Sequence, residues 1–216
     1  MGVLFAFEAV SLARDATTIL DELTLDVPDA GVTAVVGRSG SGKSTMLRCG
    51  NLLESPDSGR VMFRGEDLAG LDPRAHRRRV AMVFQRPTVF PGTAFDNLRA
   101  ADPELGEVGA AGLLDRVGLS HELLHREADH FSGGEAQRLC LARALATSPE
   151  VVLADECTSA LDGDSTRVLE DLARTLADDG IPIVWVTHDR EQMARIADHM
   201  IELDQGRLLA AQEVTR

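Results

Sequence analysis

The sequence predicts an α/β protein with a mostly parallel sheet, an antiparallel β layer near the N-terminus and an inserted α-helical subdomain. Apolar runs of strand length, such as residues 32–36 and 181–186, alternate with stretches of helical periodicity, as they do in parallel α/β sheets. Residues 3–36 are rich in alternating apolar positions, which is typical of antiparallel strands. Residues 92–130 show helical periodicity that Gly and Pro interrupt, which indicates a small helical insert.

Local patterns predict the individual elements in chain order. In the first half we expect strands at 3–12, 19–27, 32–37, 59–65 and 79–85. Between the third and fourth of these strands we expect a helix at about 42–53. In the second half we expect strand 150–156, helix 162–178, strand 181–188, helix 190–197 and a hairpin over 199–211 that turns at Gln205-Gly206. A length of 216 residues fits one domain, 1–216, with the helical subdomain at about 86–135.

Charge and composition narrow the classes of function. The net charge of −13 argues against a general nucleic-acid or anionic-membrane binder, and we interpret the basic cluster 76–79 as a solvated helix end. No apolar run reaches the roughly 18 residues of a membrane-spanning helix, and the N-terminus lacks a signal-peptide pattern. The three cysteines show neither metal-ligand spacing nor an even disulfide set. These features favour a reducing, cytoplasmic compartment.

The stretch GRSGSGKST matches the phosphate-binding pattern G-x-x-x-x-G-K-[ST] between a predicted strand and a predicted helix. Its residues are Gly37, Arg38, Ser39, Gly40, Ser41, Gly42, Lys43, Ser44 and Thr45. The glycines let the backbone wrap closely around phosphates, and successive N–H groups with the helix dipole supply positive potential. Lys43 can reach the β and γ phosphates, and the Ser44 hydroxyl can bind Mg²⁺. The stretch therefore predicts a P-loop NTPase core.

Polar side chains end three of the predicted strands, where ligands bind in α/β sheets. Asp155 and Glu156 end an apolar strand; we expect Asp155 to hold Mg²⁺, directly or through water, and Glu156 to activate the attacking water. Gln85 can contact Mg²⁺ or that water, and His188 can donate a hydrogen bond to the γ-phosphate. A histidine at a strand end is more often structural, so its role depends on the other motifs.

A second polar helix start, FSGGEAQR, poses a separate question. Exposed N–H groups at Ser132, Gly133 and Gly134 would attract an anion. Ser132 and Glu135 also form the S-x-x-E pattern of a capping box, which accounts for the same residue types by helix stability alone. Both interpretations are compatible, because the cap orders the helix that presents the N–H groups.

Together these motifs resemble the ATP-binding cassette (ABC) ATPases over nearly the whole chain. GRSGSGKST resembles the Walker A motif, VVLADE the Walker B motif and FSGGEAQR the signature motif. Gln85 matches the Q-loop, His188 the H-loop, and Ser159, Ala160, Leu161 and Asp162 the D-loop. The resemblance implies ATP and Mg²⁺ as cofactors and a head-to-tail homodimer, in which Ser132, Gly133, Gly134 and Glu135 cap the γ-phosphate held by the partner.

The sequence departs from the family pattern at four positions. Phe131 replaces the usual Leu, Glu135 replaces Gln, and Cys157 follows Glu156 where Pro is common. The larger departure is Arg14, at the position where the family offers an aromatic ring to the adenine. Either Arg14 stacks on the adenine through its planar guanidinium or the adenine is held loosely, and both alternatives predict weak base specificity.

The resemblance implies an ATP-hydrolysing subunit that powers solute transport by an integral membrane permease from the cytoplasmic face of the membrane. The permease would dock on residues 86–97, where Val89, Phe90 and Phe95 either form an exposed apolar patch or pack inside the insert. The alternative is a soluble assembly or mechanical ATPase of the same superfamily. The interval between Lys43 and Ser132 leaves no room for the long coiled coils of DNA-repair members, and the acidic charge disfavours nucleic acid.

Overall fold

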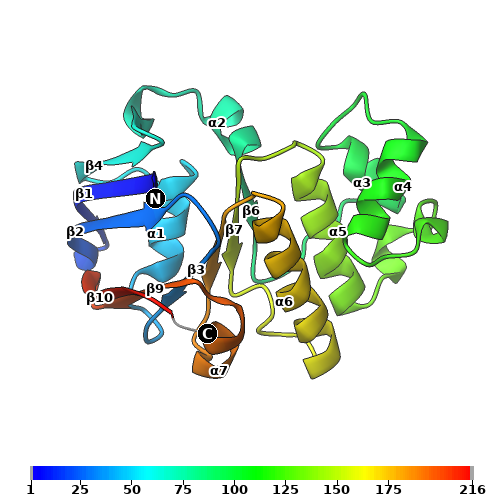
Figure 1. The fold of residues 1–216 in the computed structure, drawn as a ribbon. Helices are drawn as coiled ribbons and strands as arrows, with labels where there is room; N and C mark the ends of the chain where they lie inside the picture. Colours follow the sequence, from blue (N-terminus) through cyan, green and yellow to red (C-terminus); the bar gives the residue numbers. More distant parts are fainter. Residues whose placement is uncertain (1, 215–216) are drawn as a thin grey trace.

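The fold is built around a six-stranded sheet that runs through the middle of the molecule (Figure 1). The computed structural model describes residues 2–214. The sheet has the order β10-β9-β3-β8-β7-β6, and all neighbours are parallel except β9 and β10. Its strands are β3 (Val32–Val36), β6 (Val80–Val83), β7 (Val151–Asp155), β8 (Ile183–Val186), β9 (His199–Asp204) and β10 (Arg207–Glu213). Strands β3, β7 and β8 are buried along their whole length, as their apolar sequences predict.

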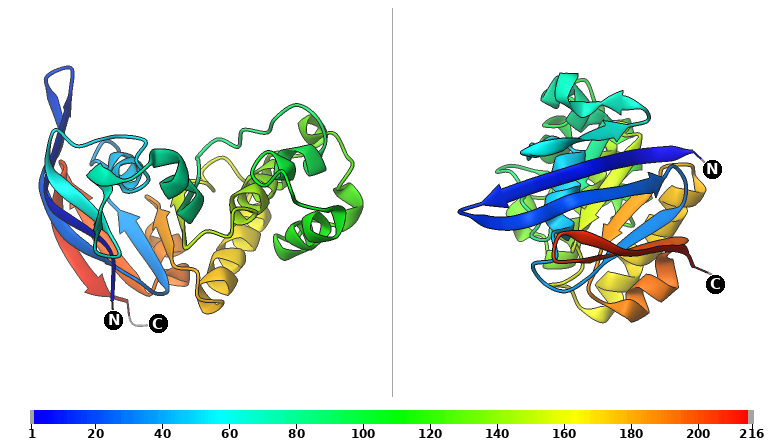
Figure 2. Two further views of the ribbon diagram at one scale, coloured as in Figure 1. Left: turned by 90° about the horizontal axis from the view of Figure 1, so that it is seen from above. Right: turned by 90° about the vertical axis from the view of Figure 1, so that its left-hand side faces the viewer.

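An antiparallel sheet of order β2-β1-β4-β5 forms a second layer (Figure 2). Its strands are β1 (Val3–Arg14), β2 (Thr17–Pro28), β4 (Ser58–Phe63) and β5 (Glu66–Asp67). A large apolar cluster joins the inner face of this layer to helix α1 (Lys43–Gly50) and to one face of the parallel sheet. Its members include Phe5, Phe7, Met46 and Leu153. Helix α1 is therefore packed between the two sheets.

A second apolar cluster covers the opposite face of the parallel sheet. Val152 and Ala154 of β7 belong to it, whereas Leu153 between them belongs to the first cluster, as the alternation of side chains along a strand requires. The helices on this side are α3 (Ala94–Arg99), α4 (Glu107–Arg116), α5 (Gly133–Leu145), α6 (Gly163–Asp178) and α7 (Arg190–Ile196). Figures 1 and 2 show α3 and α4 at the end of the molecule farthest from β1 and β2.

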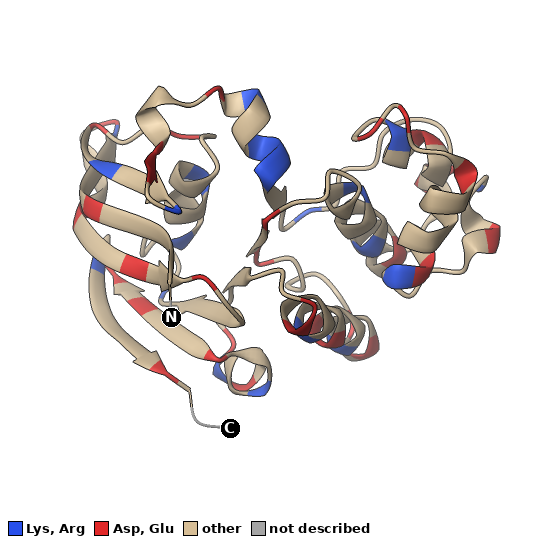
Figure 3. Cartoon of the chain, turned by 45° about the horizontal axis from the view of Figure 1, so that its top comes forward, with Lys and Arg blue, Asp and Glu red and all other residues tan. Residues whose placement is uncertain are grey.

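The fold class predicted from the sequence is confirmed, and two local expectations need correction. Helix α1 ends at Gly50 rather than near Leu53, because Leu52 has a left-handed φ of 57° and the Leu53 and Glu54 N–H groups both turn back to Arg48 O. The basic cluster of α2 (Pro73–Arg79), clear in Figure 3, is not simply a solvated helix end.

His76 of α2 is 2% exposed, and its Nε2 bonds with Gly50 O at 2.9 Å. Burial, as the largest influence, lowers the pKa of this imidazole. The short segments η1 (Leu68–Gly70), η2 (His121–Leu123) and η3 (Ala128–His130) are 3₁₀ turns. Across residues 2–214, no helix has the length and apolar character needed to cross a membrane.

Candidate active site

The predicted phosphate loop joins the buried end of β3 to the first turn of α1. Gly37 and Gly42 have left-handed φ angles of 147° and 98°. A Cβ at Gly37 would lie 2.2 Å from Leu203 O, and one at Gly42 would lie 2.9 Å from Ile19 O. Both positions therefore exclude a side chain by conformation and by space. A Cβ at Gly40, by contrast, would meet no heavy atom within 4 Å, so this part of the loop faces an open space.

The Lys43 side chain arches back over this loop. Its Nζ donates hydrogen bonds to Gly37 O and Arg38 O, each at 2.9 Å, although the residue is only 5% exposed. Burial lowers the pKa of this ammonium group, while Glu156 and Asp155 act in the opposite direction. A cation is thus held at the centre of the loop, where phosphate oxygens can become its partners.

Two oxygen ligands suited to Mg²⁺ meet beside the loop. The Ser44 hydroxyl donates to Asp155 Oδ1 at 2.6 Å, and Asp155, at the end of β7, is 5% exposed. No group of three or more His, Cys, Asp or Glu side chains that could hold a metal occurs within residues 2–214. Mg²⁺ in nucleotide sites needs no such cluster, because one or two protein oxygens, phosphates and waters complete its shell. The donor set therefore fits Mg²⁺ bound together with a nucleotide.

Glu156 and His188 face each other across the ends of β7 and β8. Glu156 has a φ of 46°, which turns its side chain out of the line of the strand, and its N–H donates to Val186 O at 3.3 Å. Its Oε2 lies 3.7 Å from His188 Nδ1. Glu156 is partly buried, with its side chain 24% exposed, whereas that of His188 is 66% exposed. An exposed imidazole beside a sheltered carboxylate is available to a ligand that enters from solvent.

Gln85 contacts the D-loop rather than the Ser44–Asp155 pair. Its Nε2 donates to Ser159 Oγ at 3.1 Å. Two tight turns lead into the D-loop, because Ser159 N donates to Glu156 O and Leu161 N donates to Thr158 O, each at 3.1 Å. Asp162 ends it as the N-cap of α6 and accepts from Ser165 N at 2.8 Å. One short segment therefore links Glu156, Gln85 and the start of α6.

The capping box predicted at the start of α5 is present. Ser132 N donates to Glu135 Oε2 at 2.8 Å, and Glu135 N donates to Ser132 Oγ at 3.3 Å. The bond from Ser132 N–H, as the largest influence, lowers the pKa of Glu135. Helices α5 and α1 contact opposite faces of the parallel sheet, as Figure 1 also shows. The start of α5 therefore lies away from the phosphate loop of its own chain.

Arg14 lies at the tip of the β1–β2 hairpin and has a partner that sequence reasoning missed. Its Nη2 lies 2.7 Å from Glu54 Oε1, and the two side chains are 55% and 8% exposed. Ile19 and Leu20 of β2 lie against Gly42, so this strand passes beside the phosphate loop. Glu54, a buried carboxylate that follows α1, anchors the exposed Arg14 guanidinium at the hairpin tip.

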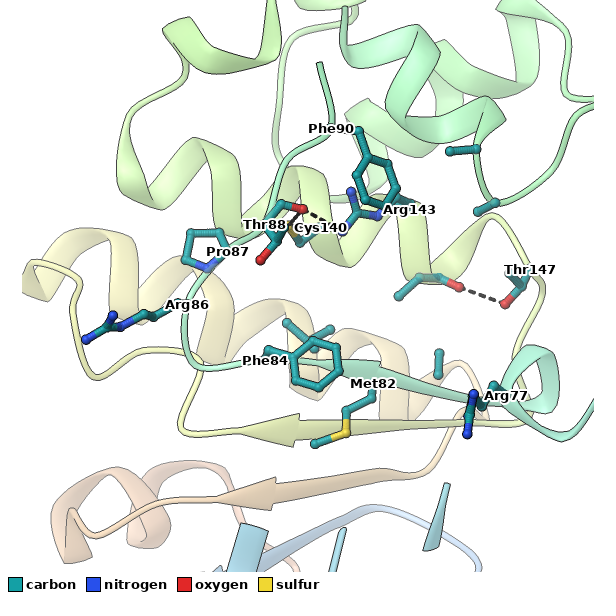
Figure 4. A pocket seen from close by; sticks show the side chains of 15 residues that line it. Arg77, Met82, Phe84, Arg86, Pro87, Thr88, Phe90, Cys140, Arg143 and Thr147 are labelled. Carbon is teal, nitrogen blue, oxygen red and sulfur yellow. Dashed lines mark hydrogen bonds between the residues drawn. The ribbon is translucent and has the colours of Figure 1, made fainter. Parts of the chain in front are cut away.

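A groove of about 460 Å³ opens between β6 and α5 (Figure 4). It is lined by Arg77, Ala81, Met82, Val83, Phe84, Arg86, Pro87, Thr88, Phe90, Ala100, Ala101, Cys140, Arg143, Ala144 and Thr147. Side chains of α5 fix its wall: Gln137 Nε2 donates to Phe84 O at 2.9 Å and Arg143 Nη2 to Thr88 O at 2.8 Å. The Arg143 guanidinium lies 4.2 Å from the Phe90 ring centroid.

The apolar residues of segment 86–97 divide between the two interpretations offered by the sequence. Val89 and Phe95 pack against the cluster around α3 and α5, so they belong to the interior of the helical region. Phe90 is 44% exposed and lines the groove.

Comparison with known proteins decides the family. A family model described as ABC transporter matches residues 20–159. The chain belongs to the ABC transporter family. This membership confirms the resemblance read from the motifs: the chain is an ATP-binding cassette ATPase that uses ATP with Mg²⁺. The sequence is 42% identical to Protein STAR1 of Oryza sativa subsp. japonica, over 88% of this chain and 57% of that protein.

Two further ABC relatives are bacterial. The chain is 38% identical to the phosphate import ATP-binding protein PstB 2 of a Synechococcus strain, over 90% of this chain and 79% of the relative. It is 41% identical to the methionine import ATP-binding protein MetN of Haemophilus influenzae, over 89% of this chain and 59% of the relative. The chain thus spans little more than half of STAR1 and of MetN.

Solved ABC structures agree with the fold. A bacterial Atm1-family ABC exporter with ATP bound superposes with a TM-score of 0.88 at 26% identity, covering 97% of this chain and 38% of the exporter. A dimeric ATP-binding cassette in a post-hydrolysis state, bound to ADP and Pi, superposes with a TM-score of 0.85 at 27% identity, covering 98% of this chain and 99% of the other.

Sequence reasoning missed two residues, Thr158 and Gln192, that lie beside Glu156 and His188. A pocket of about 250 Å³ at Glu156 and His188 is also lined by Thr158 and Gln192. Gln192 lies one helical turn after His188, and Thr158 lies two residues after Glu156. A polar residue at these spacings carries no distinctive pattern, so the sequence offered no signal for them.

Proposed function

We propose that the chain is the ATP-hydrolysing subunit of a solute transporter and acts as a head-to-tail dimer beneath an integral membrane permease. The observation that carries this proposal is the convergence of Lys43, the Ser44–Asp155 pair, Glu156 and His188 at the ends of β3, β7 and β8. A cation, a pair of metal ligands and a candidate base thus occupy one edge of the sheet, as phosphoryl transfer to water requires.

In this proposal each residue has a separate task. Residues 37–45 wrap the phosphates with backbone N–H groups, and Lys43 neutralises the β and γ phosphates. Ser44 and Asp155 would hold Mg²⁺, which would supply positive charge to the phosphate oxygens. Glu156 orients the attacking water and accepts its proton, while the exposed His188 donates a hydrogen bond to the γ-phosphate. Gln85, which hydrogen-bonds with Ser159 of the D-loop, would contact Mg²⁺ or the attacking water.

The signature residues act on the partner's nucleotide. Because α5 and α1 cover opposite faces of the sheet, Ser132, Gly133, Gly134 and Glu135 face away from their own phosphate loop. A second copy related by a two-fold axis would place the start of α5 over the partner's γ-phosphate. The D-loop, Ser159 to Asp162, follows Glu156 directly and would line the same interface. ATP then joins the subunits, and hydrolysis releases them.

Arg14 supplies the platform for the nucleobase. Glu54 holds its guanidinium at the tip of the β1–β2 hairpin, and a planar cation can stack on any purine ring. Stacking on the face of the ring forms no hydrogen bonds with the groups that distinguish adenine from guanine. We therefore expect ATP and GTP to bind with affinities within about tenfold of each other.

The groove receives the permease. One wall is the segment after β6, in which the lining residues Phe84 and Arg86 flank Gln85, so an occupant would press on the segment that contacts the D-loop. Two relatives are named as import ATP-binding proteins, which supports a transporter role over a soluble assembly ATPase. We place the chain on the cytoplasmic face of the membrane, where its permease would present a docking segment. The helical subdomain, at about 86–135, would move with that segment.

The test is a pull-down of the tagged Glu156→Gln protein from gently solubilised source cells in the presence of MgATP. We expect an integral membrane protein in stoichiometric amount. The matched control is the same protein with Phe90→Glu, which alters the groove without touching the nucleotide residues. Recovery that the second substitution abolishes would support the proposal. Recovery of soluble partners alone would refute the transporter role and favour the assembly ATPase.

A further inference from the structure

A buried polar network lies behind the candidate active site and is centred on the amide of Gln192, which is 3% exposed. Gln192 Oε1 accepts a hydrogen bond from Trp185 Nε1 at 3.1 Å. Its Nε2 donates to Thr158 Oγ1 at 3.1 Å and to Glu170 Oε1 at 3.0 Å. Arg195 then donates from Nε and Nη2 to the two carboxylate oxygens of Glu170, at 2.9 and 2.8 Å.

The partners dictate the orientation of the amide. An indole N–H only donates and a carboxylate only accepts, so Oε1 must face Trp185 and Nε2 must face Glu170. Thr158 is then held by the remaining N–H. An apolar side chain at this position would leave the buried Trp185 N–H and Glu170 carboxylate without these partners, which is unfavourable, and would break the link to Thr158. The hydrogen bond from Gln192 therefore fixes the position of the Thr158 side chain relative to α7.

The network joins the two segments that carry the hydrolytic residues. Thr158 lies between Glu156 and the D-loop residue Ser159, which in turn binds Gln85. Trp185 and Gln192 stand on either side of His188 along the chain, in β8 and in α7. Glu156 Oε2 and His188 Nδ1 lie 3.7 Å apart. The hydrogen bond from Gln192 to Thr158 joins the two segments that carry these side chains and so helps to fix their separation.

We propose that Gln192 is a positioning residue for ATP hydrolysis, which holds the Glu156–Ser159 segment in register with His188 through Thr158. This inference rests on the proposed hydrolytic role of Glu156. Gln192 acts through Thr158, whose hydroxyl accepts a hydrogen bond from its amide. Loss of this amide changes the alignment of the base and leaves in place the phosphate loop, which the Gln192 hydrogen bonds do not reach.

The first test compares Gln192→Met with wild type in ATP binding and steady-state hydrolysis. We expect the Kd for ATP to stay within about twofold and kcat to fall about 10- to 100-fold, the range that misalignment of a catalytic group produces. Thr158→Val should show the same split, because it breaks only the link to the loop. Leu176→Ala, in the apolar core of α6, is the control for general destabilisation and should lower Tm without lowering kcat below Tm.

The second test uses Gln192→Glu, because a carboxyl group at this position can donate to Glu170 only when it is protonated, while its carbonyl oxygen can accept from Trp185 and from the Thr158 hydroxyl. Glu170 faces it from α6, Arg190, Glu191, Arg195 and the N-cap Asp189 carry the charges of α7, and Glu156 and His188 line the same pocket. Ionisation removes the donor to Glu170 and sets two carboxylates side by side, so we expect this variant's kcat, relative to wild type, to recover as the pH falls. A merely structural residue would lose kcat equally at every pH.

Trp185 gives a direct structural check. It is the chain's single tryptophan, so its indole N–H yields one ¹H–¹⁵N resonance. We expect this resonance to shift in Gln192→Met and to stay in place in Leu114→Ala, a buried change in α4 outside the cavity that Trp185 lines. A shifted resonance with wild-type kcat would overturn the positioning role of Gln192 and leave the proposed function intact. Absence of MgATP turnover in the wild type would overturn both.

Discussion

Gly134 lies where the starts of α5 and α6 meet, and adding one methyl group there tests the arrangement of the signature helix. A Cβ at Gly134 would lie 2.5 Å from Ser165 Oγ and 2.9 Å from Ser165 Cβ. The Ser165 hydroxyl is not free to turn away without loss, since it donates to Asp162 Oδ2 at 3.0 Å. Rotation alone does not relieve the contact, because the Cβ clash remains.

The expected magnitude follows from two opposing effects. Overpacking of this kind costs about 1–3 kcal/mol. Replacing Gly by Ala in a helix gains up to about 1 kcal/mol, and less in a first turn such as that of Gly134. Gly134→Ala should therefore lower the free energy of unfolding by roughly 1–2 kcal/mol. In a chain of this length that corresponds to a drop in Tm of about 2–8 °C.

Urea unfolding of four proteins measures this effect: wild type, Gly134→Ala, Ser165→Gly and the double variant. The double variant should recover about 1–2 kcal/mol relative to the sum of the single changes, because the clash has been removed. Gly133→Ala is the matched control, since its Cβ would lie 3.9 Å from Leu161 in ordinary contact. A Gly134→Ala protein as stable as wild type, with no coupling to Ser165, would refute the reasoning.

Four further outcomes are expected. Glu156→Gln should retain ATP binding, abolish turnover and trap an ATP-bound dimer, which size-exclusion chromatography with MgATP detects; a near-normal hydrolysis rate would remove Glu156 from its role. Lys43→Ala should weaken ATP binding at least tenfold in equilibrium titration, because the central cation of the loop is lost. Gly112→Ala, on an exposed turn of α4 with no atom within 4 Å of the new Cβ, should raise stability by up to about 1 kcal/mol in urea unfolding, and a loss would contradict the helix assignment. The capping carboxylate of Glu135 has a lowered pKa in the folded state, so its stabilising effect should be complete above its ordinary pKa of about 4.3 and disappear as the pH falls through the folded value. The stability difference between wild type and Glu135→Ala should therefore be larger at pH 7 than at pH 3, and equal differences would argue against the capping box.

The parts of the fold that the sequence predicted are those set by local chemistry. The phosphate loop is recognisable because only glycine tolerates positions such as Gly37 and Gly42, so spacing along the chain reports geometry in space. Strands β3 and β7 are recognisable because burial on both faces demands continuous apolar residues. The capping box at Ser132 is likewise a contact between residues three apart, and it formed as expected.

The parts that the sequence did not predict are contacts between segments far apart in the chain. Arg14 binds Glu54, Gln85 binds Ser159, and neither pair has a spacing that marks it. His76 sits in a run of arginines yet is buried, because the fold brings Gly50 O to its ring. Such contacts depend on how the sheets pack, and no local periodicity encodes that packing.

Helix α5 connects the two surfaces on which the proposed function depends. Its first turn carries the signature residues, and three turns farther along the same helix Arg143 holds Thr88 in the wall of the groove. Between them, the fully buried Gln137 holds Phe84, the neighbour of Gln85. A helix of this length moves as a unit, because its backbone bonds are satisfied internally. In the proposed dimer, an occupant that displaces the groove wall would therefore tilt the start of α5 or break these bonds, and closure of the dimer would act on the groove in return.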